Sequence, residues 1–371
     1  MEVFRPRGFD KPMFYLTLAL IAAGLVMVTS ASGVYAGKIY HQKMYFSIQQ
    51  FVGAVLSMIL IFAVLLRIRR PFYKDPIFVF GLLGLTLGLL LLALVMPPVA
   101  HTNRWVVLAR MRFQPSELAK ISLILFLAWF LDRQREKITE FKTLAIPMGV
   151  VALFAFLIIR EPDFGTAVLV LALCLIVLYL GGAQLKHFAM IGLVVVPLLG
   201  IYLFSAQYRV NRMLAFFSPG GSVDNLNFQV VQSKLAVGAG GLWGVSLGES
   251  VQKYFFLPCS HTDFIFAIIG EEFGLAGTLA LIALFALLVW RGIVISMKAP
   301  DFFSQITAAG LTLFLGFQVL LNITVVLGLA PAKGVPLPLV SFGRSSLFCV
   351  LLAIGLLLHI SQRRGDGRKT A

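Results

Sequence analysis

LPCSHTDFIFAIIGEEFG, Leu257–Gly274, opens an apolar run that continues to Trp290. The run is long enough to cross a membrane as a helix. It places Asp263 near its start, with Glu271 and Glu272 about 12 Å further in at about 1.5 Å per residue. Ionisable side chains at that depth are costly and are usually retained because they bind or react with something. The stretch therefore predicts a membrane helix with a candidate functional carboxylate at its mouth.

The composition of the whole chain is that of a polytopic membrane protein. Of its 371 residues, 59% are hydrophobic and only 13% are charged, and the mean hydropathy is +0.93. A soluble domain carries about 25% charged residues. The net charge of +15 lies in short loops between apolar runs, where the orientation rule for membrane proteins explains it. We therefore expect no nucleic-acid partner. The three cysteines, Cys174, Cys259 and Cys349, have no metal-binding spacing.

Apolar runs of about 17–25 residues predict an all-α fold with about ten transmembrane helices. We expect one integral membrane domain over residues 1–371. The predicted spans are 13–32, 47–66, 76–96, 115–131, 144–159, 166–181, 188–204, 264–290, 305–329 and 345–360.

The distribution of Lys and Arg predicts the orientation of these spans. An even number of spans places both termini on one side of the membrane. The segments on that side, among them 67–75, 132–142 and the tail 362–370, hold most of the Lys and Arg residues. By the positive-inside rule both termini are cytoplasmic, and the long loop at 205–262 is extracytoplasmic.

The loop at 205–262 has an internal order of its own. It begins with a basic, aromatic piece, Gln207–Pro219, and continues with Asn227–Gly238, whose mixed polar and apolar pattern fits a short helix at the membrane interface. A glycine-rich run follows at 238–248. Backbone amides in such a run can cradle a phosphate, but a flexible hairpin explains the glycines equally well.

A second outer loop gathers cationic charge close to a predicted helix start. Arg104, Arg110 and Arg112 precede Pro115, which suits the first turn of a helix. Glu117 and Lys120 follow with a spacing at which they can pair. Lys120 and the arginines could hold a diphosphate, which these side chains bind well. Alternatively, Glu117 and Lys120 form a self-neutralising pair that lets the helix begin at the interface.

The last outer loop, Leu327–Ser346, is apolar yet contains three prolines and Gly334. These residues forbid a continuous helix. Unpaired backbone is not tolerated facing lipid, so the loop predicts a re-entrant segment that lines a cavity. Lys333 and Arg344 add cations to the same face.

Five segments of the chain together resemble the signature segments of the SEDS family, the shape, elongation, division and sporulation proteins. In chain order they are RFQPSELAK (112–120), EPDFGTA (161–167), QS…GAGGLWGVSLG (232–248), HTDFIFAIIGEEFG (261–274) and KGVPLPLVSFG (333–343). The resemblance covers nearly the whole chain. It implies a multi-pass peptidoglycan glycosyltransferase of the bacterial cytoplasmic membrane that polymerises lipid II into glycan strands.

Within the family the chain most resembles the cell-division member, which implies septal cell-wall synthesis. The elongation member is the close alternative. A lipid II transporter and a scaffold that only activates a partner synthase are alternatives from other functional classes. The expected partners are lipid II, glycan linked to undecaprenyl diphosphate, a class B penicillin-binding transpeptidase and other divisome membrane proteins.

The resemblance implies a role for each candidate residue. Asp263 is the catalytic base, although Thr262 or Asp263 could instead cap the eighth span. Contacts to substrate are expected from Arg112, Glu117, Lys120, Arg209, Arg212, Lys234, His261, Lys333, Ser341 and Arg344. Supporting structural roles are expected for Glu161, Asp163, Glu271 and Glu272. The resemblance implies no particular cofactor, but a divalent cation, Mg²⁺ or Mn²⁺, held by carboxylates could assist the leaving group.

The chain departs from the family pattern at two places. Cys259-Ser260 stand where the family usually has Glu followed by Ala or Arg, and Gly343-Arg344 stand where it usually has two glycines. The first change removes a carboxylate four residues before Asp263. The second places a bulky cation where bare backbone is expected.

Overall fold

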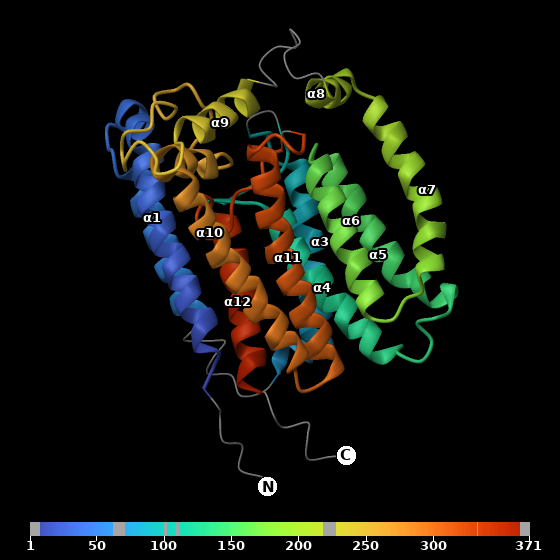
Figure 1. The fold of residues 1–371 in the computed structure, drawn as a ribbon. Helices are drawn as coiled ribbons and strands as arrows, with labels where there is room; N and C mark the ends of the chain where they lie inside the picture. Colours follow the sequence, from blue (N-terminus) through green and yellow to red (C-terminus); the bar gives the residue numbers. More distant parts are fainter. Residues whose placement is uncertain are drawn as a thin grey trace.

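The computed structural model describes residues 8–61, 71–99, 102–108, 111–217, 228–331 and 333–363. Within them the fold is almost entirely helical (Figure 1). The helices are α1 Lys11–Tyr40, α2 Tyr45–Leu60, α3 Pro76–Val95, α4 Pro115–Arg133, α5 Phe141–Arg160, α6 Phe164–Leu180, α7 Leu185–Phe204, α8 Gln207–Phe217, α9 Phe228–Ala239, α10 Ile265–Met297, α11 Phe302–Val326 and α12 Arg344–Gln362. A short 3-10 helix, η2, covers Phe72–Lys74, and strands β1 Val106–Leu108 and β2 Met111–Phe113 form an antiparallel hairpin.

Each predicted span coincides with a helix, and the chain is a multi-pass membrane protein. Seven helices are long and apolar enough to cross a membrane, and α2 and α6 are shorter apolar helices. The remaining predicted span, 115–131, coincides with α4, which has charged residues near both ends, among them Glu117 and Arg133. For the second predicted span, 47–66, residues 62–66 lie outside the described part of the chain.

Local sequence explains where several helices begin. The carboxylates of Asp10, Asp75, Asp163 and Asp301 accept hydrogen bonds from backbone amides in the first turns of α1, α3, α6 and α11. An acceptor at this position satisfies an amide that has no partner within the helix. α4 begins at Pro115, where the missing amide hydrogen is no loss.

The bundle is centred on α4, α11 and α12, and α7 stands at its edge (Figure 1). Nearly every residue of α4 from Pro115 to Leu131 is buried. In α12, 83% of the most apolar window is buried, against 6% in α7. A helix that is apolar all round and little covered by protein faces lipid in a membrane protein.

The two ends of the bundle differ in character. At one end, Arg291 in the second half of α10 pairs with Asp10 at 2.5 Å, and the Asp10 amide donates to the Ser361 hydroxyl at 3.0 Å. The start of α1 and the end of α12 therefore lie together, as an even number of spans requires. The opposite end carries α8, α9 and the loop that leads into α10 (Figure 1).

The eighth predicted span is not one continuous helix, because α10 is broken at Gly274 (φ 63°, ψ −159°). The glycine-rich run packs on this break. The amides of Val245 and Ser246 donate to the carbonyls of Glu271 and Glu272 at 3.0 and 3.1 Å, and the Leu275 amide donates to Gly241 at 2.9 Å. The run thus covers a broken helix and is not the flexible hairpin that was one expectation. Several of its amides already donate to backbone carbonyls, so the expected phosphate cradle finds no support.

Candidate functional site

Asp263 lies in the loop immediately before α10. The helix begins at Ile265, and its N-cap residue, Phe264, makes no side-chain cap. The interpretation of Thr262 or Asp263 as the cap of this helix was therefore wrong. Among the described residues, the Asp263 carboxylate has neither a hydrogen bond nor an ion pair.

Asp263 lines a pocket of about 500 Å³. One wall is the turn between α1 and α2, another is the β1–β2 hairpin, and the third is the loop between α11 and α12. The pocket combines arginines with aromatic rings. Its lining includes Arg104, Arg112, Arg344, Tyr40, Tyr45, Phe46, Trp105, Phe342 and Gly334.

Burial governs the electrostatics of Asp263. It raises the pKa of the carboxyl from 3.8 to about 6, against the opposing effect of the Arg104 guanidinium, and Asp163 adds to the rise. Arg104 itself pairs with Asp163 at 3.6 Å. A carboxylate with a pKa near 6 is ionised at neutral pH and is a stronger base than an ordinary aspartate.

The loop between α11 and α12 is non-helical as predicted and contributes to the pocket wall. A Cβ atom at Gly334 would lie 2.8 Å from Asp263 Oδ2, so this loop passes directly against the carboxylate. Only glycine leaves room there. The buried Ser341 donates to the Thr262 carbonyl and accepts from the Leu337 amide at 2.8 Å. Ser341 therefore joins two loops, and it does not line the pocket, so its expected contact with substrate finds no support.

His261 lies beside Asp263 without lining the pocket. Its ring packs between Phe46 (centroids 4.6 Å apart) and Tyr35 (5.5 Å). Burial lowers the pKa of His261 to about 4, so the side chain is neutral at pH 7. A neutral, ring-packed histidine supports the pocket wall and supplies no positive charge for an anion.

Glu117 and Lys120 form the self-neutralising pair. Lys120 Nζ lies 2.6 Å from Glu117 Oε1, and both side chains are buried. The ammonium group also lies 4.8 Å from the centre of the Phe314 ring. With its charge matched in this way, the pair is a structural part of the start of α4, and neither residue lines the Asp263 pocket.

Lys333 is the cation next to this pair. Its side chain lies against Gly165 in the first turn of α6. Burial lowers the pKa of Lys333 to about 8, and Asp163 opposes the decrease. Lys333 forms no ion pair within the described residues. A desolvated and unmatched ammonium group is a candidate ligand for an anion.

The structure does not bring every predicted cation to Asp263. Arg209 on α8 stacks on Tyr202, 3.7 Å from the ring centre, and donates to Ser205 at 2.7 Å. Lys234 on α9 is exposed beside Gly328. Neither residue lines the pocket, so their expected contacts with substrate find no support. The side chain of Arg212 and the whole of Arg110 lie outside the described part of the chain.

Glu161 and Asp163 occupy the corner between α5 and α6. Asp163 caps α6 and pairs with Arg104. Glu161 is fully buried, and neither carboxyl oxygen has a hydrogen-bond partner. Burial raises the pKa of Glu161 to about 8, with Asp163 adding to the rise, so this side chain is largely protonated at pH 7.

Glu271 and Glu272 tie the outer loop to α10. Glu271 accepts from the Ser250 hydroxyl and from the Val251 amide at 2.9 Å. Glu272 pairs with buried Lys253 at 3.2 Å and accepts from the Ser30 hydroxyl of α1 at 2.6 Å. These partners account for two carboxylates that are otherwise costly at this depth.

The described residues do not supply a ligand set for a divalent cation. They hold no group of three or more His, Cys, Asp and Glu side chains that could bind a metal ion. We therefore derive no catalytic step through Mg²⁺ or Mn²⁺.

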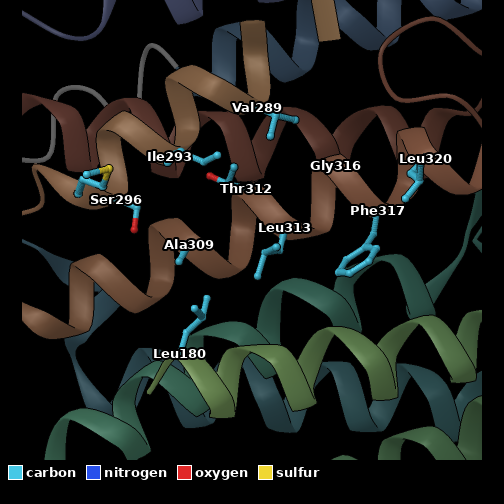
Figure 2. Close-up of a pocket in the computed structure, with 11 residues that line it drawn as sticks. Leu180, Val289, Ile293, Ser296, Ala309, Thr312, Leu313, Gly316, Phe317 and Leu320 are labelled. Carbon is cyan, nitrogen blue, oxygen red and sulfur yellow. The ribbon is translucent and has the colours of Figure 1, made fainter. Parts of the chain in front are cut away.

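A second pocket, of about 400 Å³, lies away from this chemistry between α6, α10 and α11 (Figure 2). Its lining is apolar apart from Ser296 and Thr312, and Leu313 and Phe317 point into it from α11 (Figure 2). Among the described residues no titratable side chain lines it, so we place the functional site at Asp263.

Sequence reasoning missed two residues that bear on the site and one that holds the outer loop. Arg104 was noted only as one of several outer cations, and Asn322 in α11 was not singled out. Lys253, the buried partner of Glu272, was overlooked. Asn322 is 1% exposed and donates to the Asp263 carbonyl at 2.8 Å. The available signal was a lone amide inside an apolar run, because polar side chains within membrane helices usually bond to another segment.

Comparison with known proteins identifies the family. The chain matches the model of the cell cycle protein family that is named for FtsW, RodA and SpoVE over residues 11–365. It is 36% identical to the probable peptidoglycan glycosyltransferase FtsW of Geobacter sp. (strain M18), over 97% of this chain and 98% of that protein. It is 37% identical to the stage V sporulation protein E of Bacillus subtilis (strain 168), over 95% and 97% of the two chains.

Solved structures agree with the sequence relatives. A chain in a peptidoglycan synthase complex that coordinates polymerization and crosslinking has a TM-score of 0.79 and 29% identity, over 96% of this chain and 99% of that chain. The rod shape determining protein RodA of Thermus thermophilus has a TM-score of 0.69 and 28% identity, over 96% and 97% of the two chains. This chain therefore belongs to the cell cycle protein family of FtsW, RodA and SpoVE, which is the SEDS family.

Proposed function

We propose that this protein is a peptidoglycan glycosyltransferase that polymerises lipid II into glycan strands. The observation that carries the proposal is Asp263, a carboxylate without a partner among the described residues, in a pocket that three arginines also line. A base beside cations is what the transfer of a sugar from a diphosphate requires. Relatives with this activity in their names support the same conclusion.

Asp263 acts as the general base in this proposal. The 4-hydroxyl of the GlcNAc on one lipid II molecule gives its proton to the Asp263 carboxylate. The hydroxyl oxygen forms a bond to the MurNAc anomeric carbon of a strand linked to undecaprenyl diphosphate. The bond from that carbon to the diphosphate oxygen breaks, and the lipid diphosphate leaves with the electron pair. A single displacement inverts the configuration at the anomeric carbon.

The cations of the site stabilise the leaving diphosphate. Arg112 and Arg344 line the pocket with Asp263 and have no ion pair within the described residues. A guanidinium group can donate two parallel hydrogen bonds to the oxygens of a phosphate, which suits this role. Lys333, unmatched and close to Asp163, adds a third cation. Arg104 is already paired with Asp163. Its role in the site is to oppose the rise in the pKa of Asp263 that burial causes.

The proposed setting is the outer face of the bacterial cytoplasmic membrane. Both termini lie in the cytoplasm, and the segment 205–262, which contains α8 and α9, is the large outer loop of a single membrane domain. Sequence relatives that carry the name FtsW favour septal synthesis during division over a role in elongation. The synthase complex among the similar structures supports a class B penicillin-binding transpeptidase as partner. Other divisome membrane proteins are further proposed partners, on the resemblance to the cell-division member alone.

A gel assay with the purified protein tests this function. Fluorescent lipid II is incubated with the full chain, alone and together with a cognate transpeptidase. We expect a ladder of glycan strands that a muramidase digests. A protein that moves lipid II across vesicles without forming polymer would be a transporter, and one with neither activity would be a scaffold. Either result would refute the proposal.

A further inference from the structure

Asn322 is a buried amide near the end of α11 that faces the functional site. Its side chain is 1% exposed. Its Nδ2 group donates to two backbone carbonyls, that of Asp263 at 2.8 Å and that of Val335 at 2.7 Å. Both donors of the amide are therefore used. The two carbonyls belong to different loops, one leading into α10 and the other joining α11 to α12.

These two loops enclose the Asp263 carboxylate. Val335 directly follows Gly334, where a Cβ atom would lie 2.8 Å from Asp263 Oδ2. One side chain thus fixes the backbone that carries the carboxylate and the backbone that passes against it. A hydroxyl or an alkyl side chain cannot replace it, because only an amide or a cationic group offers two donors from one atom.

We propose that Asn322 is a positioning residue, which holds the Asp263 backbone against the loop between α11 and α12 so that the carboxylate faces the pocket. The inference rests on the proposed function, in which that carboxylate removes a proton from the acceptor hydroxyl. Asn322 lies outside the pocket lining and is not expected to contact substrate.

Other contacts keep the two loops together when Asn322 is changed. The Ser341 hydroxyl bonds to the Thr262 carbonyl, and the Phe342 amide donates to the His261 carbonyl at 3.0 Å. These ties lie one and two residues before Asp263. Loss of Asn322 should therefore leave the fold in place but free the Asp263 backbone, and displacement of a catalytic group by about 1 Å can reduce a rate about 100-fold.

Gln318 provides a matched control. It lies one turn earlier on α11 and is also a fully buried amide. Its Nε2 group donates to the Ser346 hydroxyl at 3.2 Å and has no bond to either loop carbonyl. Gln318→Ala removes a buried amide from the same helix, so it measures the general cost of such a loss.

The test is the steady-state rate of lipid II polymerisation by the purified full chain. For Asn322→Ala we expect kcat to fall about 10- to 100-fold, whereas KM, which reflects substrate binding by the cations, changes less than about threefold. For Gln318→Ala we expect both constants to stay within about threefold of wild type. Asn322→Gln, which keeps the amide on a longer chain, should recover part of the loss in kcat.

Thermal midpoints and membrane levels of each variant separate positioning from folding. If Asn322→Ala does not accumulate, Asn322→Ser replaces it with the same expected fall in kcat, because it keeps at most one of the two bonds. A kcat equal to wild type, or an equal fall for Asn322→Ala and Gln318→Ala, overturns the inference while leaving the proposed function intact. Absence of polymer from the wild-type protein in the same gel refutes the proposed function, and the inference with it.

Discussion

Asp263 differs from Glu271 and Glu272, the acidic residues further along the same run, in having no partner among the described residues. Glu272 pairs with Lys253, and Glu271 accepts hydrogen bonds from the outer loop. The Asp263 carboxylate, by contrast, pairs with no described residue, and burial raises its pKa to about 6. A buried carboxylate that the fold leaves unmatched is a better candidate for chemistry than one that the fold neutralises.

The raised pKa predicts the pH dependence of the reaction. A general base works only when ionised, so the polymerisation rate should fall as the pH decreases through about 6. An aspartate with the ordinary value of 3.8 would stay active down to about pH 4. Initial rates at lipid II concentrations well below KM report kcat/KM and therefore the pKa of the free protein, and their profile from about pH 4.5 to about pH 8 measures the difference. A flat profile over this range would argue against Asp263 as the base.

The same shift predicts a cost in stability at neutral pH. The folded-state pKa of Asp263 lies above the ordinary value, so ionisation opposes folding at pH 7, and the cost disappears once the pH is below both values. Asp263→Asn removes the charge. Its thermal midpoint should therefore exceed that of wild type at pH 7, with the gap closing as the pH falls towards 4. A lower midpoint for the variant at pH 7 would contradict this explanation.

At the scale of elements, the break in α10 joins the outer loop to the membrane helices. At Gly274 the backbone adopts a conformation that glycine alone tolerates well. Amides of the glycine-rich run replace the helical bonds that are lost there. The Lys253–Glu272 pair and the bond from Ser30 fix the same loop to α10 and α1. The loop continues into Asp263 and then into α10. Its attachment therefore fixes the position of the candidate base at the start of the helix.

Removal of Lys253 should expose the importance of this attachment. Lys253→Met leaves the buried Glu272 carboxylate without its cation, and breaking a buried pair in this way costs about 3–5 kcal/mol. The added change Glu272→Gln should restore part of the loss, because no unpaired charge remains. The control is Lys298→Met, an exposed position at the end of α10, which should shift stability by less than about 0.5 kcal/mol. Denaturation in detergent measures the stability of each variant. A double variant that is no more stable than Lys253→Met would refute the pairing.

At the scale of the whole molecule, polar function is concentrated at one end. α9 and the loop that leads into α10 lie at the end of the bundle opposite to the start of α1 (Figure 1). Asp263 directly precedes α10, and the arginines line the same pocket. A lipid-linked substrate with a polar head can reach such a site from the membrane surface while its chain stays in the bilayer.

The proposed orientation can be tested by thiol labelling. In a background with the exposed Cys259 changed to Ser, Glu249→Cys should react with an impermeant reagent on intact spheroplasts. Glu136→Cys should react only after lysis. Both positions are exposed in the structure, whereas Ser222, which the sequence suggests for the same purpose, lies outside its described part. The reverse labelling pattern would place the site in the cytoplasm.

The membrane spans could be predicted from the sequence because apolar length alone determines them. The break at Gly274 could not, because a glycine within an apolar run has the same pattern whether the helix continues or breaks. The pocket joins residues as distant as Tyr40 and Arg344, and no local pattern reveals such a meeting. The prediction that Arg209 and Lys234 bind substrate rested on their positive charge alone. Charge does not indicate where a side chain points.

The central claim is that Asp263 removes the proton from the acceptor hydroxyl. Asp263→Asn keeps the shape of the side chain but cannot accept that proton at neutral pH. The most direct measurement is the polymer formed from labelled lipid II by this variant and by wild type at equal amounts of folded protein. We predict a rate reduced by about 10²- to 10⁴-fold, with unchanged membrane insertion and retained binding of lipid II. Polymer formation close to that of wild type would contradict the claim and place the base elsewhere.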